Sequence, residues 1–227
     1  MTLRNLLIIM AAAVSLISTS AQEAKYKWDI GVAAGMSGYI GDANSGFPFR
    51  HPGAAVSLLG RYNFNTRLSL RAQTGIQTIS GNTSDMDNVL PDNAQYKFNT
   101  SVFDFGVRGE FNFFPYGIGE TYKRLRRCTP YAAIGAGLVV GGSKGNRTAA
   151  FALPLGVGVK YKLSERFNLG AEWGFTKTFS DKIDSKDLND LYQIKSSFIK
   201  NTDWLSTITV SLTYEFGERC EVCNRKD

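Results

Sequence analysis

The sequence has few of the residues from which enzymes build catalytic and metal sites: one histidine and three cysteines among 227 residues. Histidine is the most common acid–base catalyst and a frequent metal ligand, so metal-rich hydrolase sites have almost no candidate ligands here. The only histidine, His51, precedes Pro52 in a predicted loop, where a lone histidine is ordinarily a surface residue. We therefore expect no enzymatic activity and no cofactor or metal.

Charged residues are also scarce, at 20% of the chain, whereas glycine (23 residues) and aromatic residues (12%) are abundant. Such a chain is too aromatic to be disordered and too glycine-rich for a helical bundle. Beyond the N-terminus no stretch of about 18 uninterrupted apolar residues occurs, so no membrane-spanning helix is predicted. Two classes remain, a secreted soluble domain or a β-barrel, because only helices and closed barrels satisfy their backbone groups within lipid.

Residues 1–21 are typical of a secretory signal peptide. Arg4 supplies the positive charge, residues 6–17 form the apolar run, and small residues precede Gln22. The apolar run is shorter than the ~18–20 residues that a spanning helix needs, which favours a signal peptide over an uncleaved anchor. We expect export, followed by a barrel over residues 22–217 and a periplasmic tail over residues 218–227.

Apolar and polar residues alternate with a period of two in most of the chain. The clearest run is 103–113, where five phenylalanine and valine side chains and a glycine alternate with Asp104, Gly106, Arg108, Glu110 and Asn112. Such a strand has one apolar and one polar face, as a strand between lipid and a polar lumen does. In the run 131–140 both faces are small and apolar, so the pattern does not assign its sides.

Eight such runs are present, an even number that permits antiparallel closure. Connections at 63–67 and 164–166 are short, while those at 42–51, 80–97, 142–149 and 180–203 are long. Short inner turns and long outer loops are typical of outer-membrane barrels. A soluble lipocalin-like barrel would instead have a polar exterior and an apolar lumen. The sequence thus predicts an all-β fold, an eight-stranded antiparallel transmembrane β-barrel of the outer-membrane type.

Charged residues on the polar faces predict a network of ion pairs in the lumen. Four are basic and four acidic, and they come from six of the strands: Arg61, Arg71, Asp104, Arg108, Glu110, Lys160, Glu172 and Glu215. An eight-stranded barrel is just wide enough to be filled by side chains, and buried charges persist when they are paired. This favours a structural plug over the alternative, an ion path or proton relay.

The connection at 115–129 is long for the inner side of such a barrel and strongly basic. It contains Lys123, Arg124, Arg126 and Arg127 against Glu120. Two interpretations remain open: attraction to anionic lipid headgroups, or a docking surface for a periplasmic partner. Nucleic acid is excluded as a partner by the expected compartment, despite a net charge of +6.

All three cysteines, Cys128, Cys220 and Cys223, fall on the predicted periplasmic side, in an oxidising compartment. The CxxC pair of Cys220 and Cys223 lacks the following histidine of a haem attachment site and has no second CxxC for zinc. Because the number is odd, one thiol remains after any single disulfide. A local staple of the tail is favoured, and pairing of the remaining thiol with a partner protein is the alternative.

Several short motifs, in their order along the chain, resemble the PorG-like family of Bacteroidetes outer-membrane proteins. They are GMSGYIGD at 35–42, FNFFP at 111–115, TPY at 129–131 with GAG at 135–137, PLGVGVKY at 154–161, LGAEWG at 169–174, and TFSD at 178–181. The sequence departs from the family where Lys182 and Ile183 stand in place of the usual aromatic residue.

The resemblance implies a component of the type IX secretion system, located in the outer membrane and associated with the periplasmic ring proteins PorK and PorN. It gives the basic connection and the cysteine-bearing tail a possible role in contacting that ring. The alternative is a stand-alone barrel, an adhesin or small porin, that acts through its outer loops.

Overall fold

The computed structural model describes residues 24–40, 49, 52–82, 97–119, 124–141, 148–179 and 204–219. The predicted signal peptide, most of the long loops, His51, Lys123, Cys220 and Cys223 lie outside these residues.

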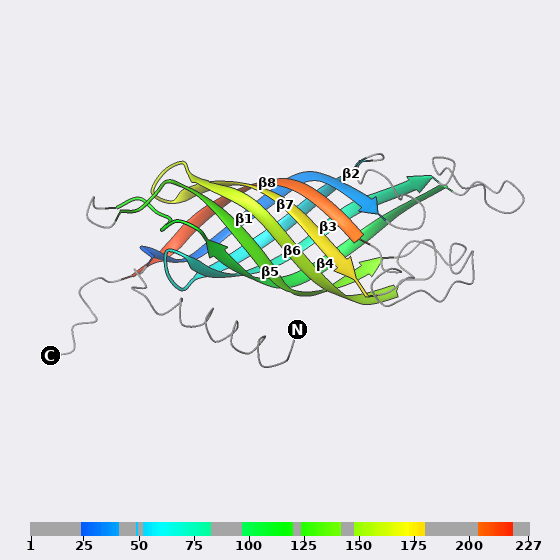
Figure 1. Ribbon diagram of the computed structural model, residues 1–227, viewed down its shortest axis with the longest axis horizontal. Helices are drawn as coiled ribbons and strands as arrows, with labels where there is room; N and C mark the ends of the chain where they lie inside the picture. Colours follow the sequence, from blue (N-terminus) through cyan, green and yellow to red (C-terminus); the bar gives the residue numbers. More distant parts are fainter. Residues whose placement is uncertain are drawn as a thin grey trace, which may run out of the picture.

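Eight antiparallel strands form a closed barrel in which each strand pairs with its neighbours in sequence and β1 pairs with β8 (Figure 1). The strands are β1 (Tyr26–Ile40), β2 (Gly53–Asn63), β3 (Leu68–Asn82), β4 (Lys97–Asn112), β5 (Cys128–Gly141), β6 (Thr148–Lys162), β7 (Phe167–Thr178) and β8 (Trp204–Glu218). The predicted eight-stranded antiparallel barrel is confirmed. No helix in the described part of the chain is long and apolar enough to cross a membrane.

The two ends of the barrel differ in their connections. At one end, which we call the turn end, β1 begins, β8 ends, and short turns join β2 to β3 and β6 to β7. The opposite end, the loop end, is where β1, β3, β5 and β7 end.

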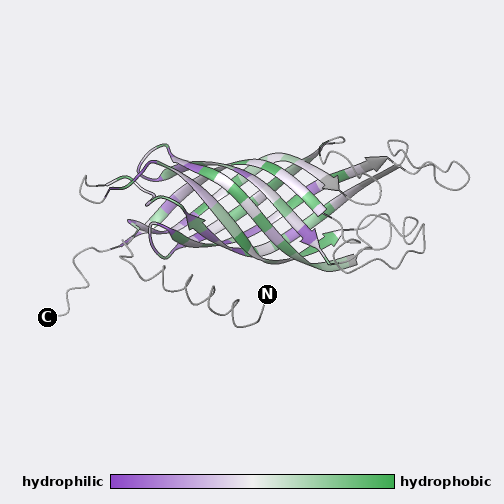
Figure 2. Ribbon diagram, in the orientation of Figure 1, coloured by the Kyte–Doolittle hydropathy of each residue, from purple (hydrophilic) through white to green (hydrophobic). Residues whose placement is uncertain are grey.

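The outer surface of the barrel is apolar, because alternate residues of every strand point away from the lumen. Ile30, Leu58 and Ile134 are 58%, 59% and 61% exposed. Figure 2 shows the resulting alternation of hydrophobic and hydrophilic positions along the strands. The lumen side carries the buried polar residues.

Aromatic side chains on this outer surface gather near both ends. Near the turn end they include Trp28, Phe111, Phe113, Phe167 and Phe216, all exposed. Near the loop end they include Phe151, Trp173, Phe175, Phe179 and Trp204. The strand positions between the two groups are mostly aliphatic, with Phe103 and Phe105 of β4 among them. Girdles of aromatic residues flanking an apolar band are a hallmark of membrane-spanning barrels.

The pairing register also assigns the faces of β5, which its sequence left open. Tyr131, Ala133 and Val139 are buried toward the lumen, whereas Ile134 and Leu138 are exposed on the outside. Small residues dominate both faces of this strand, so its orientation depends on the partners that β4 and β6 supply.

Glycine is required where neighbouring backbones approach most closely on the lumen side. A Cβ atom on Gly35 would overlap the carbonyl oxygen of Ile208, and one on Gly135 would overlap that of Val107. Gly60, in contrast, faces open space outside the barrel. The tight coiling of a narrow barrel explains this requirement at the first two positions.

Candidate functional site

The ion-pair network of the lumen is organised around Glu110 of β4, whose side chain is completely buried. Its carboxylate receives three cations: Arg61 Nε at 2.7 Å, Arg71 Nε at 3.0 Å and Lys160 Nζ at 2.5 Å. Arg61 also contacts Asp29, with Nη1 to Oδ2 at 2.5 Å. Strands β1, β2, β3, β4 and β6 are thereby joined through one carboxylate and its neighbours.

A second carboxylate, Glu172 of β7, extends this network across the barrel. Arg71 Nη1 lies 2.7 Å from Glu172 Oε2, and Arg108 Nη1 lies 2.9 Å from Oε1. The hydroxyl of Tyr131 donates a hydrogen bond of 2.6 Å to Glu172 Oε2. Arg71 therefore bridges Glu110 and Glu172.

A smaller polar cluster lies closer to the turn end. Lys162 Nζ is 2.6 Å from Glu215 Oε2 and donates to Asn168 Oδ1 at 3.2 Å. Tyr116, from the connection between β4 and β5, also donates to Asn168 Oδ1, at 2.8 Å. Burial, and then the nearby charge of Glu215, raise the pKa of the Tyr116 hydroxyl, which keeps it protonated as a donor.

The structure brings seven of the eight predicted lumen charges into ion pairs: Arg61, Arg71, Arg108, Glu110, Lys160, Glu172 and Glu215. Asp104 faces the lumen, but within the described part of the chain no ion pair joins it to the network. Sequence reasoning missed Asp29, Lys162 and Tyr131. The alternation placed Asp29 and Lys162 on lumen faces, so both had a detectable signal.

The arrangement is suited to holding strands together rather than to chemistry. Each of the paired carboxylates faces at least one cation, as buried charges require. Among the described residues no group of histidine, cysteine, aspartate and glutamate is placed to hold a metal ion.

Toward the loop end the lumen changes from charged to apolar. A cluster of buried side chains fills this section: Ile79, Val102, Val139, Ala150, Ala152 and Leu205. Ile79 and Val102 have no exposed surface. The described lumen is thus blocked by two successive layers, one of ion pairs and one of apolar side chains.

Toward the turn end the lumen opens into a polar cavity of about 500 Å³. Lys25, Glu165 and Glu218 lie at its rim, where Lys25 Nζ is 3.3 Å from Glu165 Oε2 and 3.8 Å from Glu218 Oε1. Asp29 and Arg61 line its inner part. The cavity therefore ends on the ion-pair network.

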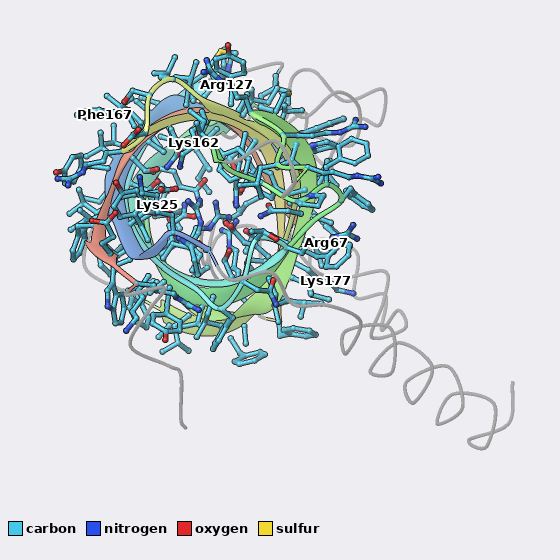
Figure 3. The ribbon with its side chains drawn as sticks, turned by 90° about the vertical axis from the view of Figure 1, so that its left-hand side faces the viewer. Lys25, Arg67, Arg127, Lys162, Phe167 and Lys177 are labelled. Atoms are coloured by element: carbon cyan, nitrogen blue, oxygen red, sulfur yellow. The ribbon has the colours of Figure 1, made fainter. Side chains whose placement is uncertain are left out.

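The basic connection between β4 and β5 folds back on itself at this end. Arg126 N donates to Pro115 O at 2.8 Å, and Gly117 N donates to Arg126 O at 3.1 Å. The guanidinium of Arg126 lies over the ring of Phe114, 4.4 Å from its centroid. Arg124, Arg126 and Arg127 are all exposed, and Figure 3 shows Arg127 pointing away from the barrel and Lys162 into it.

Of the predicted partner-binding residues, Cys128 is exposed at the start of β5, and its thiol forms no disulfide with a described residue. Lys123, Cys220 and Cys223 lie outside the described residues, so the proposed staple of the tail stays a prediction.

The sequence matches the family described as "Domain of unknown function (DUF6089)" over residues 4–225, nearly its whole length. The chain belongs to this family. No curated protein matches the sequence.

Solved structures similar to this chain include Neisserial surface protein A, at 11% sequence identity and a TM-score of 0.53, covering 83% of this chain and 97% of that protein. They also include the Yersinia pestis attachment invasion locus protein Ail, crystallised with a heparin analogue, at 13% identity, a TM-score of 0.48 and coverage of 85% and 100%. A third is the Pseudomonas aeruginosa outer membrane protein OprG, at 10% identity, a TM-score of 0.46 and coverage of 87% and 100%. The likeness to the Neisserial protein shows a shared barrel fold.

Proposed function

We propose that this protein is a non-enzymatic outer-membrane component of the type IX secretion machinery, which contacts the periplasmic ring of PorK and PorN through its turn end. The proposal combines the sequence resemblance to the PorG-like family with the charge of the turn end. The observation that carries it is the exposure of Arg124, Arg126 and Arg127 on the connection between β4 and β5.

Membrane insertion is supported by the direction of the two barrel faces. The large exposed hydrophobic residues lie outside and the ion pairs lie inside, which is the reverse of a lipocalin-like soluble barrel. An apolar surface that encircles the whole molecule far exceeds the patches found on soluble monomers. Lipid is the medium that covers such a surface.

A partner at the turn end is favoured by the chemistry of its exposed groups. Arginine is enriched at protein interfaces and binds carboxylates through paired hydrogen bonds. Three arginines within four residues offer such contacts to an acidic partner surface. The stacking of Arg126 on Phe114 orders one of the three side chains before any partner binds.

The test is recovery of the ring proteins with a tagged copy of this protein from detergent-solubilised membranes. We expect the wild type to recover PorK and PorN, and the triple variant Arg124→Glu, Arg126→Glu, Arg127→Glu to lose them. Arg67→Glu is the matched control, because Arg67 is an exposed arginine at the same end, in the turn between β2 and β3. Heat-modifiable migration on gels checks that every variant is folded.

Failure of the wild type to recover any ring protein contradicts the proposal. Equal recovery by the triple variant and the wild type contradicts the docking surface.

The alternative of a small porin is disfavoured by the filled lumen, in which charged and apolar layers follow one another. A stand-alone adhesin would act through the outer loops, so deleting those loops would abolish adhesion, and the wild type would recover no ring protein.

A further inference from the structure

The outward face of the barrel carries an isolated charge near the loop end. Lys177 of β7 is a charged side chain on the outward face, whereas the exposed charged strand residues Lys27 of β1 and Glu218 of β8 lie at the turn end. Glu218 lies at the turn-end rim and contacts Lys25. Lys177 lies on the apolar surface instead, and no carboxylate in the described part of the chain pairs with it.

Aromatic rings surround this lysine. Lys177 pairs directly with Trp204 of β8 in the strand register. Its Nζ lies 5.5 Å from the centroid of the Trp204 ring and 5.9 Å from that of Phe179. Both distances allow a cation–π interaction. Figure 3 shows the side chain outside the barrel wall.

The neighbouring surface is apolar as well as aromatic. The rings of Phe179 and Phe151 lie 5.8 Å apart, and those of Trp173 and Phe175 lie 4.8 Å apart. Lipid acyl chains and the edges of sugar rings pack well against such surfaces. A cation at the border of an aromatic girdle is at the depth where lipid headgroups begin.

A lysine at an outward position reduces stability in an apolar medium unless an anion compensates it. Among the described residues no carboxylate pairs with Lys177, so within the described structure its ammonium group can take an anion from the surroundings. Under the proposed outer-membrane orientation, on which this step rests, the loop end faces the outer leaflet. The anionic groups at that depth are the phosphates of glycolipids.

We propose that Lys177, together with Trp204 and Phe179, binds a phosphate group of an outer-leaflet glycolipid of the lipid A type. The ammonium group contacts the phosphate, and the two rings hold the lysine stem and cover the adjoining part of the lipid. Lysine binds phosphate as a point charge. The ammonium group must therefore lie near the phosphate, but the contact needs no particular hydrogen-bond geometry.

The experiment compares the wild type with Lys177→Leu in vesicles of phosphatidylcholine alone and of phosphatidylcholine with lipid A. The readout is the urea midpoint of unfolding. Without lipid A we expect the variant to unfold at a higher midpoint, because a charge has left the apolar surface. With lipid A we expect the order to reverse. Lys27→Leu, a change of an exposed lysine at the turn end, should show no dependence on lipid A.

Two further vesicle compositions identify the ligand. Lipid A stripped of its phosphates should abolish the reversal, and phosphatidylglycerol should not reproduce it. A variant effect that is the same with and without lipid A overturns the proposal, and so does an equal reversal with phosphatidylglycerol. Failure of the wild type to insert into any vesicle would contradict the membrane location itself. If the pull-down recovered no ring protein, the vesicle result would not change, so the two proposals can fail separately.

Discussion

Arg61 Nε lies 2.7 Å from Glu110 Oε2 inside the barrel, where Glu110 has no exposed side-chain surface. Arg71 and Lys160 contact the same carboxylate. A single negative charge thus compensates part of the charge on three cations, and the three come from different strands. We therefore expect the stability of the folded barrel to depend more on this carboxylate than on any one of its cationic partners.

Replacing Glu110 by glutamine should destabilise the barrel strongly. The variant keeps the shape of the side chain but leaves three buried cations without their shared anion. Removing one partner of a buried ion pair costs about 3–5 kcal/mol. Urea unfolding in lipid vesicles measures the difference. Asp104→Asn is the control, because no ion pair joins Asp104 to the network within the described residues; equal losses in both variants would contradict this assignment.

Removing the hydroxyl of Tyr131 should produce a smaller loss. Tyr131→Phe deletes the hydrogen bond of 2.6 Å to Glu172 and leaves the aromatic ring in place. A hydrogen bond to a charged group contributes about 1.5–3 kcal/mol. Tyr161→Phe, on the exposed outer face of β6, should change the unfolding midpoint little. A similar effect of the two substitutions would mean that the Tyr131 hydroxyl does not stabilise Glu172.

Two glycine positions should respond in opposite ways to alanine. In Gly35→Ala the new methyl group would overlap the Ile208 carbonyl on the adjacent strand, and such overpacking costs on the order of 1–3 kcal/mol. In Gly60→Ala the methyl group enters open space, so the unfolding midpoint should stay the same or rise slightly. Folding yield into vesicles gives a second readout. If Gly35→Ala folded as well as the wild type, the close approach of β1 and β8 would be wrong.

The purified barrel should not conduct ions. The ion pairs around Glu110 and the apolar layer of Ile79, Val102, Val139 and Leu205 block the lumen in series. Planar bilayer recordings should therefore show no stable, discrete channel. A large and persistent conductance would contradict the closed lumen and favour the porin alternative.

Much of the barrel was predictable from alternation alone. In β4 the two faces are distinct, because phenylalanine and valine alternate with charged and polar residues, but alternation alone did not decide which face points outward. The alternation failed for β5, where alanine and valine occur on both faces. Small side chains fit either environment, and only cross-strand pairing decides between them.

The contacts in the lumen also could not be predicted from the pattern of single strands. Alternation placed Arg61, Glu110 and Glu172 on one side of the wall, but their mutual distances depend on the stagger of the strands, which no single strand encodes. The apolar layer went unnoticed for a related reason: Ile79 lies on the same face as Gln77, so one apolar residue in a polar row carried no signal. Its partners Val102 and Val139 come from two other strands.

The central claim is that the turn end binds the periplasmic ring, and site-specific photocrosslinking in living cells tests it most directly. A photoreactive residue replacing Arg127, exposed at the turn end, should yield a crosslinked product containing PorK or PorN. The same residue replacing Val56, exposed on the apolar outer face, should yield none. A ring product from Val56, or no ring product from Arg127 in folded protein, would contradict the account.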